Sequence, residues 1–146
     1  MNNNFKKIHI GELIKKKVSE LEIEMDRICK FLSAGENEIE KMFQSYSIDT
    51  ELLLRWSKLL EYDFFRIYTQ HLILYAPPSA YDQVNSKEKK ESRLPEFRKN
   101  IYTTEIIYFI LELIETGAKT KQEVIDEYRI PKTTLYKWIS KYQERT

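Results

Sequence analysis

Glycine, proline and cysteine are scarce in this chain of 146 residues, which has three glycines, four prolines and one cysteine. Because glycine and proline most often interrupt regular structure, their scarcity favours helices over a turn-rich β protein. The single cysteine, Cys29, excludes a disulfide within the chain and indicates a reducing compartment. It lies in "MDRICKFL", on the apolar side of a helical pattern, which predicts a buried core thiol.

Long apolar runs are also missing. No apolar segment approaches the roughly 20 residues of a membrane span. The first residues, "MNNNFKK", have none of the apolar character of a signal peptide. We therefore expect a cytoplasmic protein that makes no contact with a membrane.

The sequence contains no constellation of catalytic or metal-binding residues. His9 and His71 lie far apart, and with Cys29 between them they form no zinc-like spacing. There is no glycine-rich phosphate loop. His71, in "YTQHLILY", is expected to be a partly buried structural residue. We therefore expect no enzyme activity, no cofactor, no metal and no small-molecule ligand.

Charge is distributed unevenly along the chain. The formal net charge is only +1, but the stretch from Arg129 to Thr146 holds five basic residues and one acidic residue. Such an asymmetry predicts an anionic partner for the C-terminal end.

The first 76 residues show a succession of helical spacings. The segments are "IGELIKKKVSEL", "EIEMDRICKFL", "ENEIEKMFQ", "TELLLRWSKLLEY" and "DFFRIYTQHLILY". Asp49 is expected to cap the fourth helix, and Ser33 with Glu36 has the form of a capping box for the third. Pro77 and Pro78 end the fifth. These patterns predict an N-terminal helical unit over residues 1–76.

Residues 77–100, "PPSAYDQVNSKEKKESRLPEFRKN", have a different composition. They are polar and charged, contain three prolines, and have few large aliphatic side chains. This composition predicts a linker between two units. Two roles for its charges stay open, a solvated connection or a secondary contact with phosphates.

The last segment, residues 101–146, again predicts helices. "TTEIIYFILELIETG" has one broad apolar face and a natural stop at Gly117. "TKQEVIDEYRI" opens with a capping-box pair, Thr120 and Glu123. A third helix is expected from about Pro131, since proline is tolerated in a first helical turn. The fold class is therefore expected to be all-α, with two small helical units of helix-turn-helix type joined by a polar linker.

The last helix has two unlike faces. Leu135, Trp138, Ile139 and Tyr142 recur at spacings of three and four and can pack on the preceding helices. The opposite face is polar and basic, with Lys132, Thr133, Tyr136, Lys137, Ser140 and Lys141.

The short connection around "YRIPK" and the supporting first helix match the helix-turn-helix description. In such a motif the second helix lies in the DNA major groove, with its N-terminal residues at the base edges. Lysines contact phosphates or guanine edges, and threonines form hydrogen bonds or place a methyl group against thymine. The alternative is that the lysines only keep a surface helix solvated.

The stretch "TKQEVIDEYRIPKTTLYKWISKYQ" resembles the helix-turn-helix of transposase-type proteins, especially the small first-reading-frame subunits of insertion sequences. The matching pattern is Tyr128, the turn through Pro131, then Thr133, Thr134, Leu135, Tyr136, Lys137 and Trp138. Pro131 departs from the usual serine. The resemblance covers Thr103 to Tyr142 and implies a DNA-binding subunit rather than the strand-cutting one. Together with the exposed face, it gives the expected DNA-binding set of Lys132, Thr133, Thr134, Tyr136, Lys137 and Lys141.

The N-terminal segment from Ile10 to Asp63 is similar to the Cro and repressor class of helix-turn-helix, on its core spacing. Its recognition helix would be "GENEIEKMFQ", whose Glu36, Glu38 and Glu40 would be repelled by phosphate. DNA contact and a packing or dimer-forming role therefore both stay open for this unit.

The following helix carries more large apolar residues than one face can easily bury, namely Phe64, Phe65, Tyr68, Leu72 and Tyr75. We therefore expect a homodimer formed by the N-terminal unit. The expected function is sequence-specific binding of double-stranded DNA, in transcription control or as a non-catalytic subunit in transposition. The alternative is a protein-interaction adaptor without a nucleic-acid role.

Overall fold

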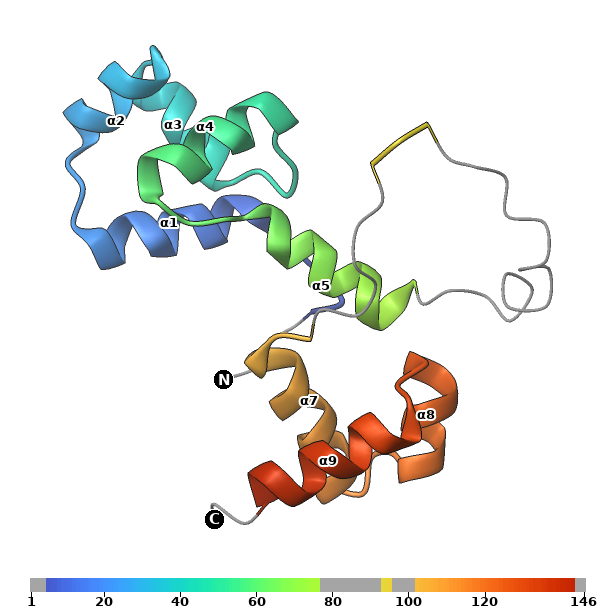
Figure 1. Cartoon of the computed structure of the whole chain (residues 1–146). Helices are drawn as coiled ribbons and strands as arrows, with labels where there is room; N and C mark the ends of the chain where they lie inside the picture. Colours follow the sequence, from blue (N-terminus) through green and yellow to red (C-terminus); the bar gives the residue numbers. More distant parts are fainter. Residues whose placement is uncertain (1–4, 77–92, 96–101, 144–146) are drawn as a thin grey trace. The chain divides into compact units, whose positions relative to one another are not determined.

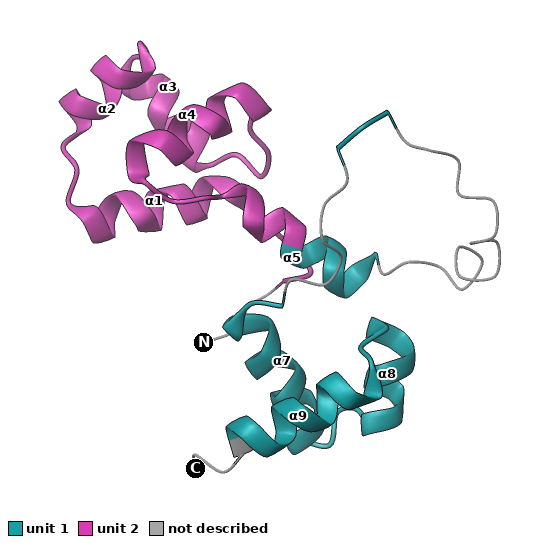
Figure 2. Cartoon of the chain, in the orientation of Figure 1, with its two compact units in different colours: residues 1–3, 70–146 teal, residues 4–69 magenta. Residues whose placement is uncertain are grey.

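The computed structural model describes residues 5–76, 93–95 and 102–143. Over these ranges the chain forms eight α-helices and no strand (Figure 1). The helices belong to two compact units, residues 4–69 and residues 70–146 with 1–3 (Figure 2). The prediction of an all-α fold with two helical groups is confirmed. Apart from residues 93–95, the expected linker over 77–100 lies outside the described ranges.

The N-terminal unit contains four helices and the start of a fifth. They are α1 (Ile10–Leu21), α2 (Met25–Leu32), α3 (Glu36–Phe43), α4 (Thr50–Leu60) and α5 (Phe65–Tyr75). Both α1 and α2 pack against α3 and α4. The division between the two units falls inside α5, after Thr69.

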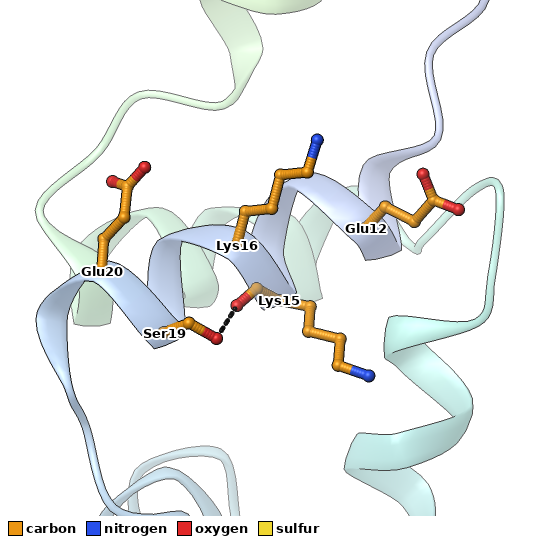
Figure 3. A pocket seen from close by; sticks show the side chains of 5 residues that line it. All are labelled: Glu12, Lys15, Lys16, Ser19 and Glu20. Atoms are coloured by element: carbon orange, nitrogen blue, oxygen red, sulfur yellow. Dashed lines mark hydrogen bonds between the residues drawn. The ribbon is translucent and has the colours of Figure 1, made fainter.

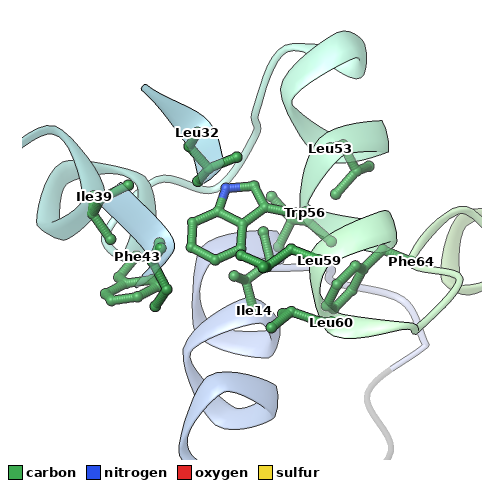
Figure 4. Close-up of a cluster of buried hydrophobic side chains, with 11 residues drawn as sticks. Ile14, Leu32, Ile39, Phe43, Leu53, Trp56, Leu59, Leu60 and Phe64 are labelled. Atoms are coloured by element: carbon green, nitrogen blue, oxygen red, sulfur yellow. The ribbon is translucent and has the colours of Figure 1, made fainter. Parts of the chain in front are cut away.

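Trp56 lies at the centre of the N-terminal core and has no exposed surface (Figure 4). Its ring centroid is 5.8 Å from that of Phe43 on α3. The indole Nε1 makes no hydrogen bond with any described residue. Aliphatic side chains from α1 to α4 complete the core: Ile10, Ile14, Ile28, Leu32, Ile39, Leu53, Leu59 and Leu60.

Of the two helix caps predicted in the N-terminal unit, one is confirmed and the other is wrong. Asp49 caps α4 as predicted, because its Oδ1 accepts the backbone N–H of Glu51 at 2.8 Å. The capping box predicted at Ser33 and Glu36 is wrong. Ser33 has a left-handed backbone, φ 51°, and ends α2 instead. The N-cap of α3 is Gly35, which has no side chain to accept a hydrogen bond.

Cys29 lies on the core side of α2, but its burial is only partial. It is a free thiol that packs against the core cluster while keeping some exposed surface. The expected apolar environment is therefore present, whereas the expected full burial is not.

The first turn of α1 is fixed to the connection that follows α3. The backbone N–H groups of Ile10 and Gly11 donate to the carbonyls of Tyr46 and Ser45, at 3.3 and 3.1 Å. These donors would otherwise lack partners at a helix start. His9 caps the same turn, because its Nδ1 accepts the N–H of Glu12 at 3.2 Å.

Helix α5 distributes its apolar residues over more than one surface. Phe65, Ile67 and Tyr68 pack against the N-terminal core, whereas Leu72 keeps 58% of its surface exposed. His71 is half-buried, as predicted, and its ring centroid is 5.1 Å from that of Tyr75. None of the helices within the described ranges has the length and apolar character needed to cross a membrane.

The second unit contains α7 (Thr104–Glu115), α8 (Lys121–Tyr128) and α9 (Lys132–Gln143). Helix α7 ends as predicted before Gly117, whose φ of +73° is rarely adopted by other residues. Gln70 on α5 donates to the N-cap hydroxyl of α7, Thr103, at 3.0 Å. The buried side chains of these three helices and their connections are Ile106, Ile107, Ile110, Leu111, Val124, Tyr128, Ile130, Leu135 and Trp138.

Candidate nucleic-acid interface

Three residues connect α8 to α9. Arg129 follows the last residue of α8 with a left-handed backbone, φ 55°, and remains exposed. Ile130 is almost completely buried. Pro131 precedes α9 rather than lying in its first turn, and its carbonyl accepts the N–H of Leu135 at 3.0 Å. A buried apolar residue in so short a connection holds the two helices in a defined relation.

Sequence reasoning missed Ile130. The available signal was an isolated large apolar residue between polar neighbours in the expected turn. A solvent-exposed turn does not need such a side chain, whereas a turn folded over a core can bury it.

One side of α9 packs on the rest of its unit. Leu135 and Trp138 are buried, and Ile139 is half-buried. Trp138 meets the ring of Tyr102 edge-on at a centroid distance of 4.8 Å. Tyr142 meets Tyr108 of α7 in the same manner at 5.6 Å. The predicted core face of α9 is therefore the one that contacts its neighbours.

The opposite side of α9 is polar and basic. The exposed residues there are Lys132, Thr133, Tyr136, Lys137, Ser140 and Lys141. Thr134, which only the resemblance suggested, is half-buried and lies nearer the packed side. Helix α9, "KTTLYKWISKYQ", contains no acidic residue. Five of the six expected site residues therefore share one exposed basic surface.

The first residue of α8 also belongs to this surface, and sequence reasoning did not find it. The Nζ of Lys121 lies 5.4 Å from the ring centroid of Tyr136, and the Nζ of Lys132 lies 5.7 Å from the same centroid. Lysines at this distance are attracted by the negative face of the ring. The fold thus brings two ammonium groups from two helices to one tyrosine.

The acidic residues of α8 are engaged with their own neighbours. Glu123 accepts the Thr120 backbone N–H at 2.7 Å, and its own N–H donates to the Thr120 hydroxyl at 3.2 Å, so the predicted capping box is confirmed. The hydrogen bond from the Thr120 backbone, reinforced by that from its hydroxyl, lowers the pKa of Glu123.

The two other acids of α8 are similarly occupied. Asp126 accepts from the amide of Gln122 at 3.0 Å. Glu127 forms an ion pair with Lys119, and this hydrogen bond raises the pKa of Lys119. The ion pair with Lys119 therefore compensates the negative charge of Glu127, one of the three acidic residues of α8.

The N-terminal unit presents a different surface on α3, the helix that the Cro and repressor resemblance would place in the groove. Glu36, Asn37, Glu38 and Glu40 are all exposed there. This helix is therefore acidic on its accessible side, which opposes contact with phosphates.

A shallow depression runs along α1 and is lined by Glu12, Lys15, Lys16, Ser19 and Glu20 (Figure 3). All five residues come from one helix, and the hydroxyl of Ser19 donates to the carbonyl of Lys15 at 3.0 Å. Since the depression is open and its charges are mixed, it has no features of a binding site. Among the described side chains, no three of the His, Cys, Asp or Glu type gather as metal ligands would.

No protein-family model matches this chain, and neither a curated protein nor a solved structure matches it. The class that the fold defines is an all-α protein with two helical units.

Proposed function

We propose that this chain is a sequence-specific binding protein for double-stranded DNA that places α9 in the major groove. The observation that carries the proposal is the pair α8 and α9. Their connection is three residues long and contains the buried Ile130, and α9 has one packed side and one exposed basic side. Two helices joined by a short turn, with the second one accessible, match the helix-turn-helix arrangement.

The residue types on the exposed side suit this partner. Lys132, Lys137 and Lys141 supply positive charge for phosphates or guanine edges. Thr133 is exposed in the first turn of α9, where a hydroxyl can meet a base edge and a methyl group can meet thymine. No carboxylate on α9 opposes the approach of DNA.

The biological setting that we propose is transcription control or a non-catalytic role in transposition. It rests on the resemblance of the segment from Thr103 to Tyr142 to transposase-type helix-turn-helix proteins. Pro131, which replaces the usual serine, has no side-chain oxygen with which to cap the first turn of α9.

The proposed role of the N-terminal unit is dimerisation rather than DNA recognition. The exposed glutamates of α3 argue against contact with a DNA groove. Helix α5 begins in this unit, and its exposed Leu72, three residues past the division between the units, offers an apolar contact. A homodimer would present two α9 helices to paired half-sites, which raises the affinity of two small modules.

The test is selection of bound fragments from a random pool of duplex DNA. The native chain is compared with a Lys132→Glu and Lys137→Glu double variant. A matched control carries Lys15→Glu and Lys16→Glu, two exposed lysines of α1 in the other unit. We expect an enriched motif for the native chain and the control, and none for the α9 variant.

Two results would contradict the proposal. Absence of DNA binding by the native chain, even at low salt, would favour a protein-interaction adaptor, since phosphate contacts are strongest at low salt. Equal losses of DNA binding in both double variants would mean that the overall charge of the protein, and not α9, attracts the DNA.

A further inference from the structure

Lys121, Lys132 and Tyr136 form a small cluster that joins the beginnings of α8 and α9. Lys121 is the first residue of α8, Lys132 is the first residue of α9, and Tyr136 lies about one turn further along α9. Both ammonium groups lie within 6 Å of the Tyr136 ring centroid, at 5.4 and 5.7 Å. We refer to these three residues as the lysine–tyrosine cluster.

The cluster gathers positive charge without a carboxylate partner. None of the ion pairs formed within the described ranges includes Lys121 or Lys132. The nearest acidic residues along α8, Glu123 and Asp126, accept hydrogen bonds from Thr120 and Gln122 instead. Both ammonium groups are positive and lie near one ring centroid, so they repel one another, and the negative face of the ring offsets part of that repulsion.

The positions of Lys121 and Lys132 at the starts of their helices are also electrostatically unfavourable. Cations are stabilised at the C-terminal ends of helices and disfavoured at the N-terminal ends, where the partial charge of the helix is positive. Lys121 and Lys132 both occupy the disfavoured end. An anion placed between them would remove the repulsion and interact favourably with both helix ends.

We propose that the lysine–tyrosine cluster binds one backbone phosphate of the DNA duplex and thereby sets the position of α9 in the groove. This inference rests on the proposed function. Lysine acts as a compact point charge with rotatable donors, which suits a phosphate oxygen. Because Lys121 belongs to α8, the contact ties both helices of the motif to the same backbone.

In this arrangement the ring of Tyr136 holds the two lysines in place and does not stack on a DNA base. Its side chain is 45% exposed, but its ring already interacts with two ammonium groups. A base that stacked on the ring would have to displace one of them. The ring keeps both lysines close to α9, so its aromatic character matters and its hydroxyl does not.

The experiment measures the affinity of the full chain for a duplex of arbitrary sequence as a function of salt. The logarithm of the binding constant falls linearly with the logarithm of the salt concentration. The magnitude of the slope is about 0.9 per phosphate contact. Lys121→Gln is compared with the native chain, with Lys132→Gln as a second member of the cluster. Lys16→Gln, an exposed lysine of α1, serves as the matched control.

We expect Lys121→Gln and Lys132→Gln each to reduce the magnitude of the slope by about one. Between about 50 and 200 mM salt, the loss of affinity should be about fourfold smaller in each variant than in the native chain. Lys16→Gln should keep the native slope. A native slope in Lys121→Gln, with a reduced slope in Lys132→Gln, would overturn the cluster while leaving DNA binding by α9 intact.

Substitutions of Tyr136 separate the ring from its hydroxyl. Tyr136→Phe keeps the ring and should keep the native slope, whereas Tyr136→Leu should reduce it. Equal effects of both substitutions would overturn the holding role of the ring. A native chain whose affinity for DNA does not depend on salt would overturn both the cluster and the proposed function. Circular dichroism of each variant confirms that it is folded.

Discussion

The backbone of Gly11 passes so close to the end of α3 that no side chain fits between them. A Cβ atom there would lie 2.3 Å from the carbonyl oxygen of Met42 and 2.5 Å from that of Phe43. Backbone atoms cannot rotate away as the tip of a side chain can. The close approach also allows the Gly11 N–H to donate to Ser45 at 3.1 Å.

We therefore expect Gly11→Ala to lower the free energy of unfolding of the N-terminal unit by about 1–3 kcal/mol, as overpacked cores do. Denaturant unfolding followed by Trp56 fluorescence measures this in a Trp138→Phe background, because the two tryptophans lie in different units. Gly35→Ala is the control, since its Cβ would meet nothing within 4 Å. It should change stability by less than about 1 kcal/mol. Equal losses in both variants would contradict the close-contact explanation.

At the scale of a helix, the capping box of α8 couples stability to pH. The folded-state pKa of Glu123 is lowered because its carboxylate accepts the Thr120 N–H. A lowered folded pKa means that the ionised form is the one stabilised. Its contribution is present above the unfolded pKa and is lost as pH falls toward the folded pKa.

Acidification from about pH 7 to about pH 3 should therefore lower the stability of the C-terminal unit through this glutamate. Glu123→Gln keeps a hydrogen-bond acceptor and should lose that part of the pH dependence. Thr120→Ala should instead cost about 1 kcal/mol at neutral pH, through loss of the cap hydroxyl. Denaturant unfolding followed by the indole NMR signal of Trp138 measures the stability of both variants. Parallel pH curves for the native and Glu123→Gln chains would exclude this glutamate as the cause.

At the scale of the whole molecule, the proposed homodimer predicts that the protein has the mass of a dimer in solution. Leu72 is the most exposed apolar residue of α5, and burial of such a surface favours association. We expect a dimer in sedimentation equilibrium, and we expect Leu72→Lys to shift it toward the monomer. Leu54→Lys, an exposed leucine of α4, is the matched control and should remain dimeric. A monomeric mass at high concentration of the native chain would contradict the dimer.

Most helices and the two faces of α9 were predictable from the sequence, because they depend on spacing between neighbours. Residues three and four apart share one face of any helix. Leu135 and Trp138 could therefore be assigned to the core, and Lys132 and Lys137 to the exposed surface. The caps at Asp49 and Thr120 were also predictable, since each acts on a backbone N–H two or three residues further along.

The capping box predicted at Ser33 was wrong because the same residues are compatible with two backbone conformations. Ser33 and Glu36 have the spacing of a capping box, but Ser33 ends α2 with a left-handed backbone. Its N–H group and that of Ala34 then bond back to the carbonyl of Cys29. The choice between starting one helix and ending another depends on how α2 and α3 pack, which neighbouring residues do not reveal.

By itself, the sequence determined the all-α fold, the helix caps at Asp49 and Thr120 and the polar, basic side of α9, because these follow from interactions within a few residues. Only the tertiary structure decided that Lys121 meets Tyr136 and that Gly11 meets the end of α3. Fifteen positions separate Lys121 from Tyr136 along the chain. No helical period relates residues on different helices, so their contact depends on how the buried Ile130 and the short turn pack α8 and α9 together.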